Sequence, residues 1–202
     1  MATNDLVTLT ETKQSLRLTT TNESDSLLTA WITAVSTRVD ELCGPVVAGT
    51  VTDELHDGGY WWIAPKLAPV YSVTTLTEYD TSGTSRSLTA EDYDTKPTDG
   101  YLVDGDLIRR RGSGGDALFE PGRRNVRLTY QAGRVANTAA VPEQIKRGVL
   151  MILAHMWREE HGTPTGQFAD DGGIVVVGAG WAIPRRARDL LGEYLRVPVR
   201  IA

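Results

Sequence analysis

Cysteine is almost absent from this chain. Cys43 is the single cysteine among 202 residues, so no disulfide bond can form within the chain, which fits a reducing cytoplasm. Long apolar runs are also missing, because no stretch approaches the length of about 18 residues that a transmembrane helix needs. The segment Met1–Asp5 has neither the basic nor the apolar region of a secretion signal. We therefore expect a protein that is made in the cytoplasm and contacts no membrane.

A surplus of positive charge is missing as well. The chain has 21 lysines and arginines against 26 aspartates and glutamates, which gives a net charge of −5. Proteins that grip nucleic acid tightly usually carry a basic surplus, so tight DNA binding is not expected. Positive charge gathers near the end of the chain, at Arg185, Arg186, Arg188, Arg196 and Arg200. Such a cluster is either a solvated helix face or a contact for a partner.

The common catalytic motifs are absent too. The sequence lacks the P-loop pattern G-x-x-x-x-G-K-[ST], the nucleophile elbow G-x-S-x-G and the zinc motif H-E-x-x-H. His155 and Glu159 are four residues apart, and a metal site built on them would need further ligands. The acidic segment Asp53–Gly58 lacks the ligand spacing of a calcium loop and is interpreted as a turn. We predict no catalytic residue, no metal and no cofactor.

Two helices are predicted near the N-terminus. Thr8 and Glu11 form the pattern of a capping box for a short helix that ends near Arg17. The second helix is capped by Asn22 or Ser24 and ends before a Gly-Pro pair at residues 44–45. Its apolar residues recur at spacings of three and four, namely Leu27, Leu28, Trp31, Ile32, Val35, Val39 and Leu42.

The middle of the chain predicts strands. From residue 46 to residue 133, β-branched and aromatic residues alternate with turn signals. Val70–Tyr79 is the clearest strand, and Asn125–Gln131 is the last one. The turn Asp104–Asp106 separates two short strands. We expect a small antiparallel β module at residues 46–133.

Two more helices are predicted after the β module. Pro142 begins a helix that runs to about His161 and carries apolar residues around most of its circumference. Residues 162–182 are rich in glycine and contain one β-prone run, Ile174, Val175, Val176 and Val177. Pro184 begins the fourth helix, and Pro198 keeps residues 196–202 extended.

These segments predict an α+β fold in a single domain, residues 1–202. Its core consists of four helices, two N-terminal and two C-terminal, and the small antiparallel β module at residues 46–133 is inserted between the two pairs. Residues 196–202 form an extended C-terminal arm.

The order of these segments resembles the head-to-tail connector, or adaptor, proteins of tailed bacteriophages. The matching segments are Leu6–Leu18, Asp25–Val35, Cys43–Pro45, Pro69–Val73, Val141–Trp157 and Ile183–Leu191. They are similar to the family's opening segment, its second helix and the end of that helix, its P-V-x-S-V strand, and its third and closing helices. The resemblance covers nearly the whole chain. The chain departs from the family pattern at Gly148 and in the glycine-rich stretch before the fourth helix.

The resemblance implies a structural virion protein and not an enzyme. Such adaptors form a homo-oligomeric ring in the neck of the virion, matching the twelvefold portal, and they are made in the host cytoplasm. The ring joins the portal protein to a head–tail stopper or tail protein. Genome DNA passes through its lumen during ejection without sequence-specific binding. A net negative charge suits such a channel, because each phosphate contact would add affinity and friction.

Two segments are the predicted contacts in this assembly. The portal-binding set joins the basic helix to the arm and comprises Arg185, Arg186, Arg188, Arg196, Val197, Pro198, Val199 and Arg200. The family's C-terminal segments reach the portal, which points the same way. The run from Ile174 to Val177 is predicted to pair with a neighbouring subunit or partner, because an unpaired β-prone segment is a template for strand addition.

Two other functions stay open on sequence alone. Tyr60, Trp61 and Trp62 favour a host-surface or carbohydrate-binding module if they are exposed, and a seal between the β module and the helices if they are buried. His155 and Glu159, together with the acidic turn, are the residues of an alternative small metal-dependent hydrolase.

Overall fold

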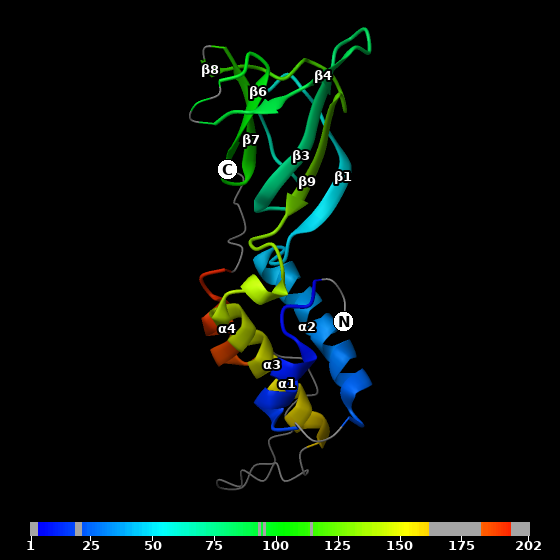
Figure 1. Cartoon of the computed structure of the whole chain (residues 1–202), viewed down its shortest axis with the longest axis vertical. Coiled ribbons are helices and arrows are strands. Elements are labelled where there is room, and N and C mark those ends of the chain that lie inside the picture. Colours follow the sequence, from blue (N-terminus) through cyan, green and yellow to red (C-terminus); the bar gives the residue numbers. More distant parts are fainter. Residues whose placement is uncertain are drawn as a thin grey trace, which may run out of the picture. The chain divides into compact units, whose positions relative to one another are not determined.

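The chain divides into two compact units. The computed structural model describes residues 4–18, 22–92, 94, 96–113, 115–161 and 183–194. A helical unit combines Met1–Cys43 with Val141–Ala202, and a β unit comprises Gly44–Ala140. Figure 1 shows the helices of the first unit and the strands of the second.

The helical unit contains α1 (Leu9–Leu16), α2 (Asp25–Cys43), α3 (Glu143–His161) and α4 (Arg185–Leu191). The predicted capping box is present at the start of α1. The Thr8 hydroxyl accepts a hydrogen bond from the Glu11 N–H at 3.1 Å, and the Glu11 carboxylate accepts one from the Thr8 N–H at 2.7 Å. No helix in the described part of the chain is both long enough and apolar enough to cross a bilayer.

Facing stripes of α2 and α3 supply most of the helical core. The buried side chains are Leu28, Ile32, Val35 and Val39 from α2 and Ile145, Val149, Ile152 and Leu153 from α3. Leu6 and Val7, just before α1, are also fully buried. α3 was expected to be apolar around most of its circumference. Leu150, Met151 and Trp157 are only partly buried, so α3 keeps one face open.

The close approach of α4 to α3 depends on Gly148. A Cβ atom at this position would lie 3.1 Å from Cγ and Cδ2 of Leu191, which is tighter than an ordinary van der Waals contact. Leu191 and Ala187 are both buried, and the Tyr194 hydroxyl donates a hydrogen bond to Gln144 Oε1 at 2.9 Å. The departure of Gly148 from the family pattern therefore has a packing reason.

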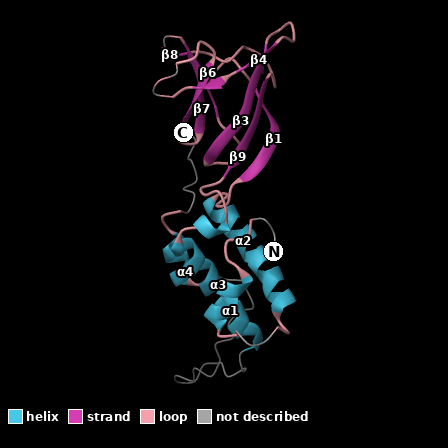
Figure 2. Ribbon diagram, viewed as in Figure 1, coloured by secondary structure: helices cyan, strands magenta, loops and turns pink. Residues whose placement is uncertain are grey.

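The β unit contains two sheets (Figure 2). The first sheet has the order β1-β9-β3-β4, and every neighbouring pair is antiparallel. Its strands are β1 (Gly49–His56), β3 (Val70–Tyr79), β4 (Ser85–Ser87) and β9 (Val126–Ala132). The pairing of β1 with β9 shifts register between Val51 and Glu54, where Asp53 has a φ of +53°.

The second sheet has the order β2-β7-β6-β5, with β8 paired to β7. Its strands are β2 (Trp62–Ile63), β5 (Thr89–Ala90), β6 (Gly100–Asp104), β7 (Leu107–Gly112) and β8 (Gly115–Asp116). β5 and β6 run parallel, so this sheet is mixed, whereas the sequence had predicted an antiparallel module. The predicted turn at Asp104–Asp106 connects β6 to β7. A short 3₁₀ helix, Thr138–Ala140, closes the unit.

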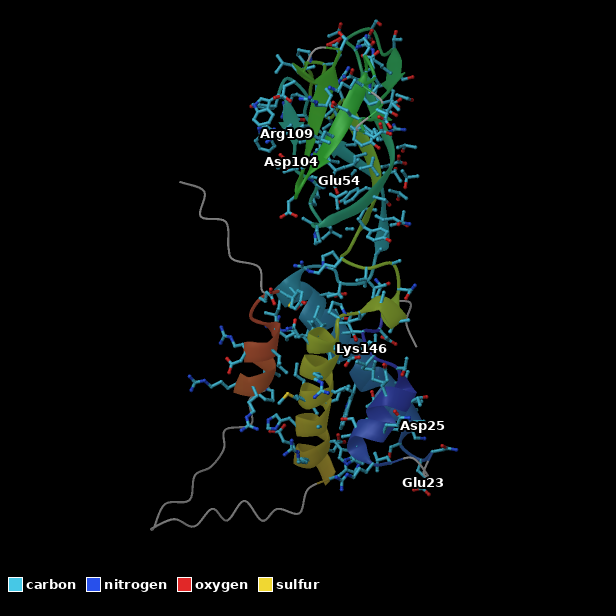
Figure 3. All side chains as sticks on the ribbon, turned by 60° about the vertical axis from the view of Figure 1, so that its left-hand side comes forward. Glu23, Asp25, Glu54, Asp104, Arg109 and Lys146 are labelled. Atoms are coloured by element: carbon cyan, nitrogen blue, oxygen red, sulfur yellow. The ribbon has the colours of Figure 1, made fainter. Side chains whose placement is uncertain are left out.

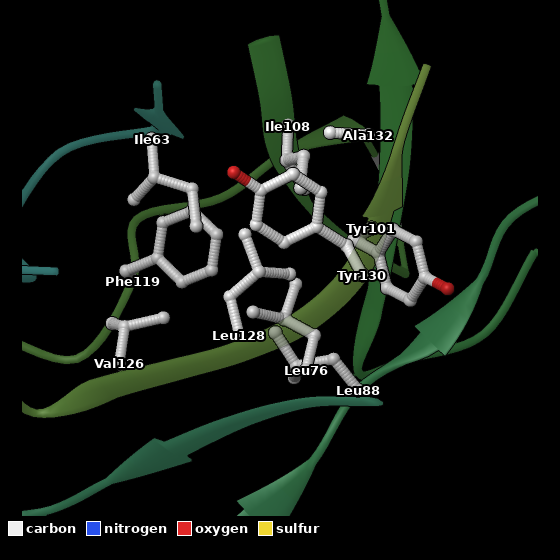
Figure 4. Close-up of a cluster of buried hydrophobic side chains, with 10 residues drawn as sticks. All are labelled: Ile63, Leu76, Leu88, Tyr101, Ile108, Phe119, Val126, Leu128, Tyr130 and Ala132. Carbon is white, nitrogen blue, oxygen red and sulfur yellow. The ribbon is translucent and has the colours of Figure 1, made fainter. Parts of the chain in front are cut away.

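Apolar side chains from both sheets meet in a core that belongs to the β unit alone (Figure 4). It consists of Ile63, Leu76, Leu88, Tyr101, Ile108, Phe119, Val126, Leu128, Tyr130 and Ala132. Alternate residues of β9 point into it, which is the period of two that a half-buried strand requires. The β unit therefore has its own hydrophobic core.

A buried ion pair also joins the two sheets. Arg110 on β7 donates to Glu78 Oε1 on β3 at 2.9 Å and to Asp99 Oδ1 at 2.9 Å. The side chains of Arg110 and Glu78 are only 4% and 1% exposed. The backbone N–H of Glu120 donates to the other Glu78 oxygen at 3.2 Å. These contacts give the buried carboxylate the partners that a charge away from water needs.

The predicted four-helix core with a small inserted β module is wrong, although the α+β class holds. The β part is a two-sheet unit with its own core, and it is not a minor addition to a helical one. Within the helical unit, α1 has 8 residues and α4 has 7, whereas α2 and α3 have 19 each. The size of the β unit could not be predicted from the sequence, because several strands have only two or three residues. Such strands are too short to show the alternation of apolar and polar residues that identifies a strand.

Candidate functional site

The structure places three of the eight predicted portal-binding residues. Arg185, Arg186 and Arg188 are exposed on α4, whereas Ala187 and Leu191 of the same helix are buried. The other five, Arg196, Val197, Pro198, Val199 and Arg200, lie outside the described residues. The predicted pairing segment, Ile174, Val175, Val176 and Val177, lies outside them as well.

A groove in the helical unit brings part of this basic helix together with α3 and the end of α1. Its volume is about 740 Å³. Its lining is Ser15, Glu143, Arg147, Leu150, Met151, Ala154, His155, Arg158, Pro184, Arg185, Arg186 and Leu190, and we call it the α3–α4 groove. The short α4 covers only part of α3, which explains why Leu150 and Met151 stay half-buried beside it.

The charge of this groove is strongly positive. Four arginines and one glutamate line it, so its formal charge without His155 is +3. Sequence reasoning identified Arg185 and Arg186 but not Arg147 and Arg158. The signal was present, because these two lie eleven residues apart, about three helical turns, and so share one face of α3 with Leu150, Met151 and Ala154.

A second candidate surface lies on the β unit. Tyr60, Trp61 and Trp62 are 63%, 39% and 37% exposed. Within the described residues, these three aromatics therefore do not form a closed seal. The register places Trp62 beside Arg109 and Arg109 beside Leu102, so these side chains share the face of the second sheet opposite its core.

Arg109 is held against this aromatic surface. Its guanidinium lies 5.0 Å from the Trp61 ring centroid, a cation–π distance, and its Nη2 lies 2.7 Å from Asp104 Oδ2 (Figure 3). The Trp61 and Trp62 rings meet edge to face at 76°. The two indole rings are therefore not coplanar and do not form one flat surface for stacking. Arg109 already covers one face of Trp61.

The arginine run Arg109, Arg110 and Arg111 does not form a free basic patch. Each arginine has a carboxylate partner: Arg109 pairs with Asp104, Arg110 with Glu78 and Asp99, and Arg111 with Glu91 and Asp116. The hydrogen bonds that Arg111 donates to Glu91 and Asp116 raise the pKa of Arg111. With their charges paired in this way, these arginines are poor partners for the phosphates of nucleic acid.

The acidic segment at residues 53–58 serves a structural purpose. Glu54 is buried, and its carboxylate accepts hydrogen bonds from the Lys66 N–H at 2.9 Å and the Tyr130 hydroxyl at 3.1 Å. His56 Nε2 lies 2.8 Å from it. Burial raises the pKa of Tyr130 to about 12. Burial also lowers the pKa of His56, against the opposing effect of Glu54. Four of its six residues, 53–56, form the second half of β1, not the predicted turn.

The residues of the hydrolase alternative do not gather into a metal site. His155 and Glu159 lie 3.3 Å apart on an exposed part of α3. Across the residues that the structure describes, no group of three or more histidine, cysteine, aspartate or glutamate side chains is placed to hold a metal ion.

Comparisons with known proteins concern the fold. No protein-family model and no curated protein matches the sequence. Solved structures do match. A chain in the neck of an empty gene transfer agent (GTA) particle with C6 symmetry is 18% identical with a TM-score of 0.62, and the match covers 100% of this chain and 96% of that one.

Two related structures give the same result. A chain in the virion of the native GTA particle is 18% identical, with a TM-score of 0.59 and coverage of 100% and 95%. A chain in the neck of the native particle with C12 symmetry is 19% identical, with a TM-score of 0.52 and coverage of 100% and 99%. This chain therefore has the same fold, over its whole length, as chains in GTA particles.

Proposed function

We propose that this protein is a structural neck protein of a phage-like particle. In this proposal it forms a homo-oligomeric ring that joins the portal vertex to the tail or stopper and lines the DNA channel. The observation that carries the proposal is the full-length match to chains in the GTA neck. The order of segments that resembles phage adaptors points the same way.

Charge supports the channel part of the proposal. The chain carries a net charge of −5, and the arginine run of the β unit is paired with carboxylates. A wall of this kind makes few phosphate contacts, so DNA slides past it without being held. In this proposal genome DNA passes through the lumen, and the protein does not bind it in a sequence-specific way.

The contacts of the ring are proposed from the basic helix and the two sequence segments beside it. α4 presents Arg185, Arg186 and Arg188 to solvent, and residues 196–200 add two arginines around Val197–Val199. These groups suit carboxylates on a portal protein. The run Ile174–Val177 is proposed to contact a neighbouring subunit. No catalytic role and no cofactor form part of the proposal.

Electron microscopy of the purified chain mixed with its portal protein tests this function. We expect closed rings seated on one end of the portal, with the heterologous contacts that cyclic symmetry requires. Particles from the source phage should show the same density at the neck. Density for this chain on the capsid surface or the distal tail would contradict the proposal.

A carbohydrate-binding role is the second candidate, because Tyr60, Trp61 and Trp62 are exposed. The edge-to-face packing of the two indoles and the arginine over Trp61 weigh against it, since sugar rings stack on open aromatic faces. Binding of the chain to a glycan array that is lost in Trp62→Ala would favour this alternative over the neck role.

A further inference from the structure

The α3–α4 groove is shaped to receive an apolar segment that carries negative charge. Leu150, Met151, Ala154 and Leu190 provide half-buried apolar surface along it. Arg147, Arg158, Arg185 and Arg186 line the same groove and are exposed. Within the described residues, Arg147, Arg185 and Arg186 make no ion pair with any carboxylate. The groove therefore combines apolar surface with arginines that lack anionic partners in that part of the chain.

The chain contains one segment outside the described residues with the matching chemistry. Residues 168–177 read Phe-Ala-Asp-Asp-Gly-Gly-Ile-Val-Val-Val, so two acids precede four β-branched residues. The other long segment outside the described residues, 195–202, carries Arg196 and Arg200 and no acid. Its charge has the same sign as the groove and is repelled by it. Charge complementarity therefore selects residues 168–177.

We propose that the α3–α4 groove binds residues 168–177 of a neighbouring copy of this chain. Asp170 and Asp171 pair with the groove arginines, and Ile174–Val177 covers the apolar surface. The inference rests on the proposed ring, because each copy has one groove and one segment. A donor–acceptor contact of this kind is heterologous, and it repeats around a closed ring.

The connections limit this exchange to a groove close to the donor's own α4, because only residues 178–182 join Val177 to Ile183 and they span about 20 Å when extended. The 12 residues from 162 to 173 separate the end of α3 from Ile174. Fully extended, they reach about 40 Å, which exceeds the length of α3 at about 1.5 Å per residue. In the assembled ring Arg185 and Arg186 then bind the neighbouring subunit, which replaces their part in the portal contact proposed above. Arg188, which does not line the groove, stays available with the C-terminal arm for the portal.

Binding of a labelled peptide tests the groove directly. The peptide comprises residues 166–179, and the receptor is the full chain carrying Asp170→Arg and Asp171→Arg, so that its own segment does not compete. We expect saturable binding by fluorescence anisotropy, with the dissociation constant raised about tenfold or more when Arg147→Glu and Arg185→Glu are added. Arg188→Glu is the matched control and leaves the affinity unchanged. Equal binding by the groove variant and the control would overturn the proposal.

Cross-linking in assembled rings tests whether the segment comes from a neighbour. Ala154→Cys in the groove and Val175→Cys in the segment are treated with a bismaleimide after assembly on the portal. Cys43 is buried, so the otherwise unchanged chain is a suitable blank. We expect a ladder of covalent multimers on denaturing gels. Cross-links within single chains, cross-links to the portal, or none at all in well-formed rings would each overturn the inference.

These outcomes separate this inference from the proposed function. Rings without the expected ladder leave the neck role intact and remove the groove contact. Absence of rings on the portal while the peptide still binds the groove counts against the neck role instead.

Discussion

Gly148 shows how one missing side chain sets the packing of a helix. We expect Gly148→Ala to destabilise the protein by about 1 kcal/mol, although alanine is normally preferred in a helix by about that amount. The reason is overpacking, which typically costs about 1–3 kcal/mol, because the new Cβ meets Leu191 at 3.1 Å. Urea unfolding of the variant measures the difference in free energy.

Leu191→Ala supplies the control for that prediction. It removes the atoms that the new Cβ would meet, so Gly148→Ala should become neutral or stabilising in the Leu191→Ala background. A cost that is the same in both backgrounds would show that α4 does not depend on Gly148 for its position.

The partly buried position of His56 predicts that the free energy of unfolding depends on pH. Burial lowers its pKa below the ordinary value of 6.5, so the folded state binds fewer protons than the unfolded state at mildly acidic pH. Its contribution is therefore fully present above about pH 6.5 and is lost as the pH falls through the folded pKa. The charged groups around it are Glu54, Lys66 and Asp57.

The variant His56→Gln checks this expectation. The free energy of unfolding, measured by urea between about pH 5 and 7, should fall with acid less steeply in the variant than in the parent chain. NMR titration of the His56 ring protons reads its pKa directly. A midpoint above 6.5 would contradict the prediction.

At the scale of elements, the buried ion pair between Glu78 on β3 and Arg110 on β7 should be sensitive to single substitutions. Glu78→Gln should destabilise the β unit by about 3–5 kcal/mol, because it leaves the buried Arg110 guanidinium without its main counter-charge. Arg86→Ala should cost less than about 1 kcal/mol, because Arg86 is half exposed and lies 3.4 Å from the same carboxylate. Chemical denaturation of both variants tests the contrast, and equal losses would refute it.

The C-terminal arm supplies a prediction about binding. Truncation after Leu195 removes residues 196–202 but keeps α4, so the chain should stay folded by circular dichroism. We expect it to lose binding to portal rings, and we expect added salt to weaken binding of the intact chain because ion pairs at a rim are screened. Normal decoration of portals by the truncated chain would place the portal contact elsewhere.

At the scale of the whole molecule, the continuous β unit should fold by itself. Gly44–Ala140 is one uninterrupted segment with two sheets and its own core, so the fragment has what a small domain needs. We expect cooperative thermal unfolding of this fragment, and we expect Leu128→Ala to lower its stability by about 2–5 kcal/mol. A fragment with no dispersed NMR spectrum would show that it depends on the helical unit.

Local patterns were enough to predict the long elements. The capping box of Thr8 and Glu11, the apolar stripe of α2 and the strand Val70–Tyr79 all appear where the sequence indicated. In each case the signal spans many residues or uses a side chain that bonds to its own backbone. The order of these segments also resembles that of phage adaptors, and the fold matches that of a chain in the neck of a GTA particle.

These local patterns could not predict contacts between residues that are far apart in the chain. β2, β5 and β8 have two residues each, and their pairing is set by distant partners that no local pattern reveals. Arg110 lies between two further arginines, and no local pattern indicates that it is the buried one. Its burial depends on Glu78, 32 residues away along the chain.

The sequence by itself determined where the helices and the strand Val70–Tyr79 lie, because capping and periodicity act between neighbouring residues. Only the tertiary structure decided that the strands build a hydrophobic core of their own. It also decided that α4 packs closely against α3 at Gly148, and that four arginines line one groove. Those features depend on contacts between residues that are far apart in the chain. Such contacts are chosen by packing and by the pairing of buried charge, which act only once the segments have come together.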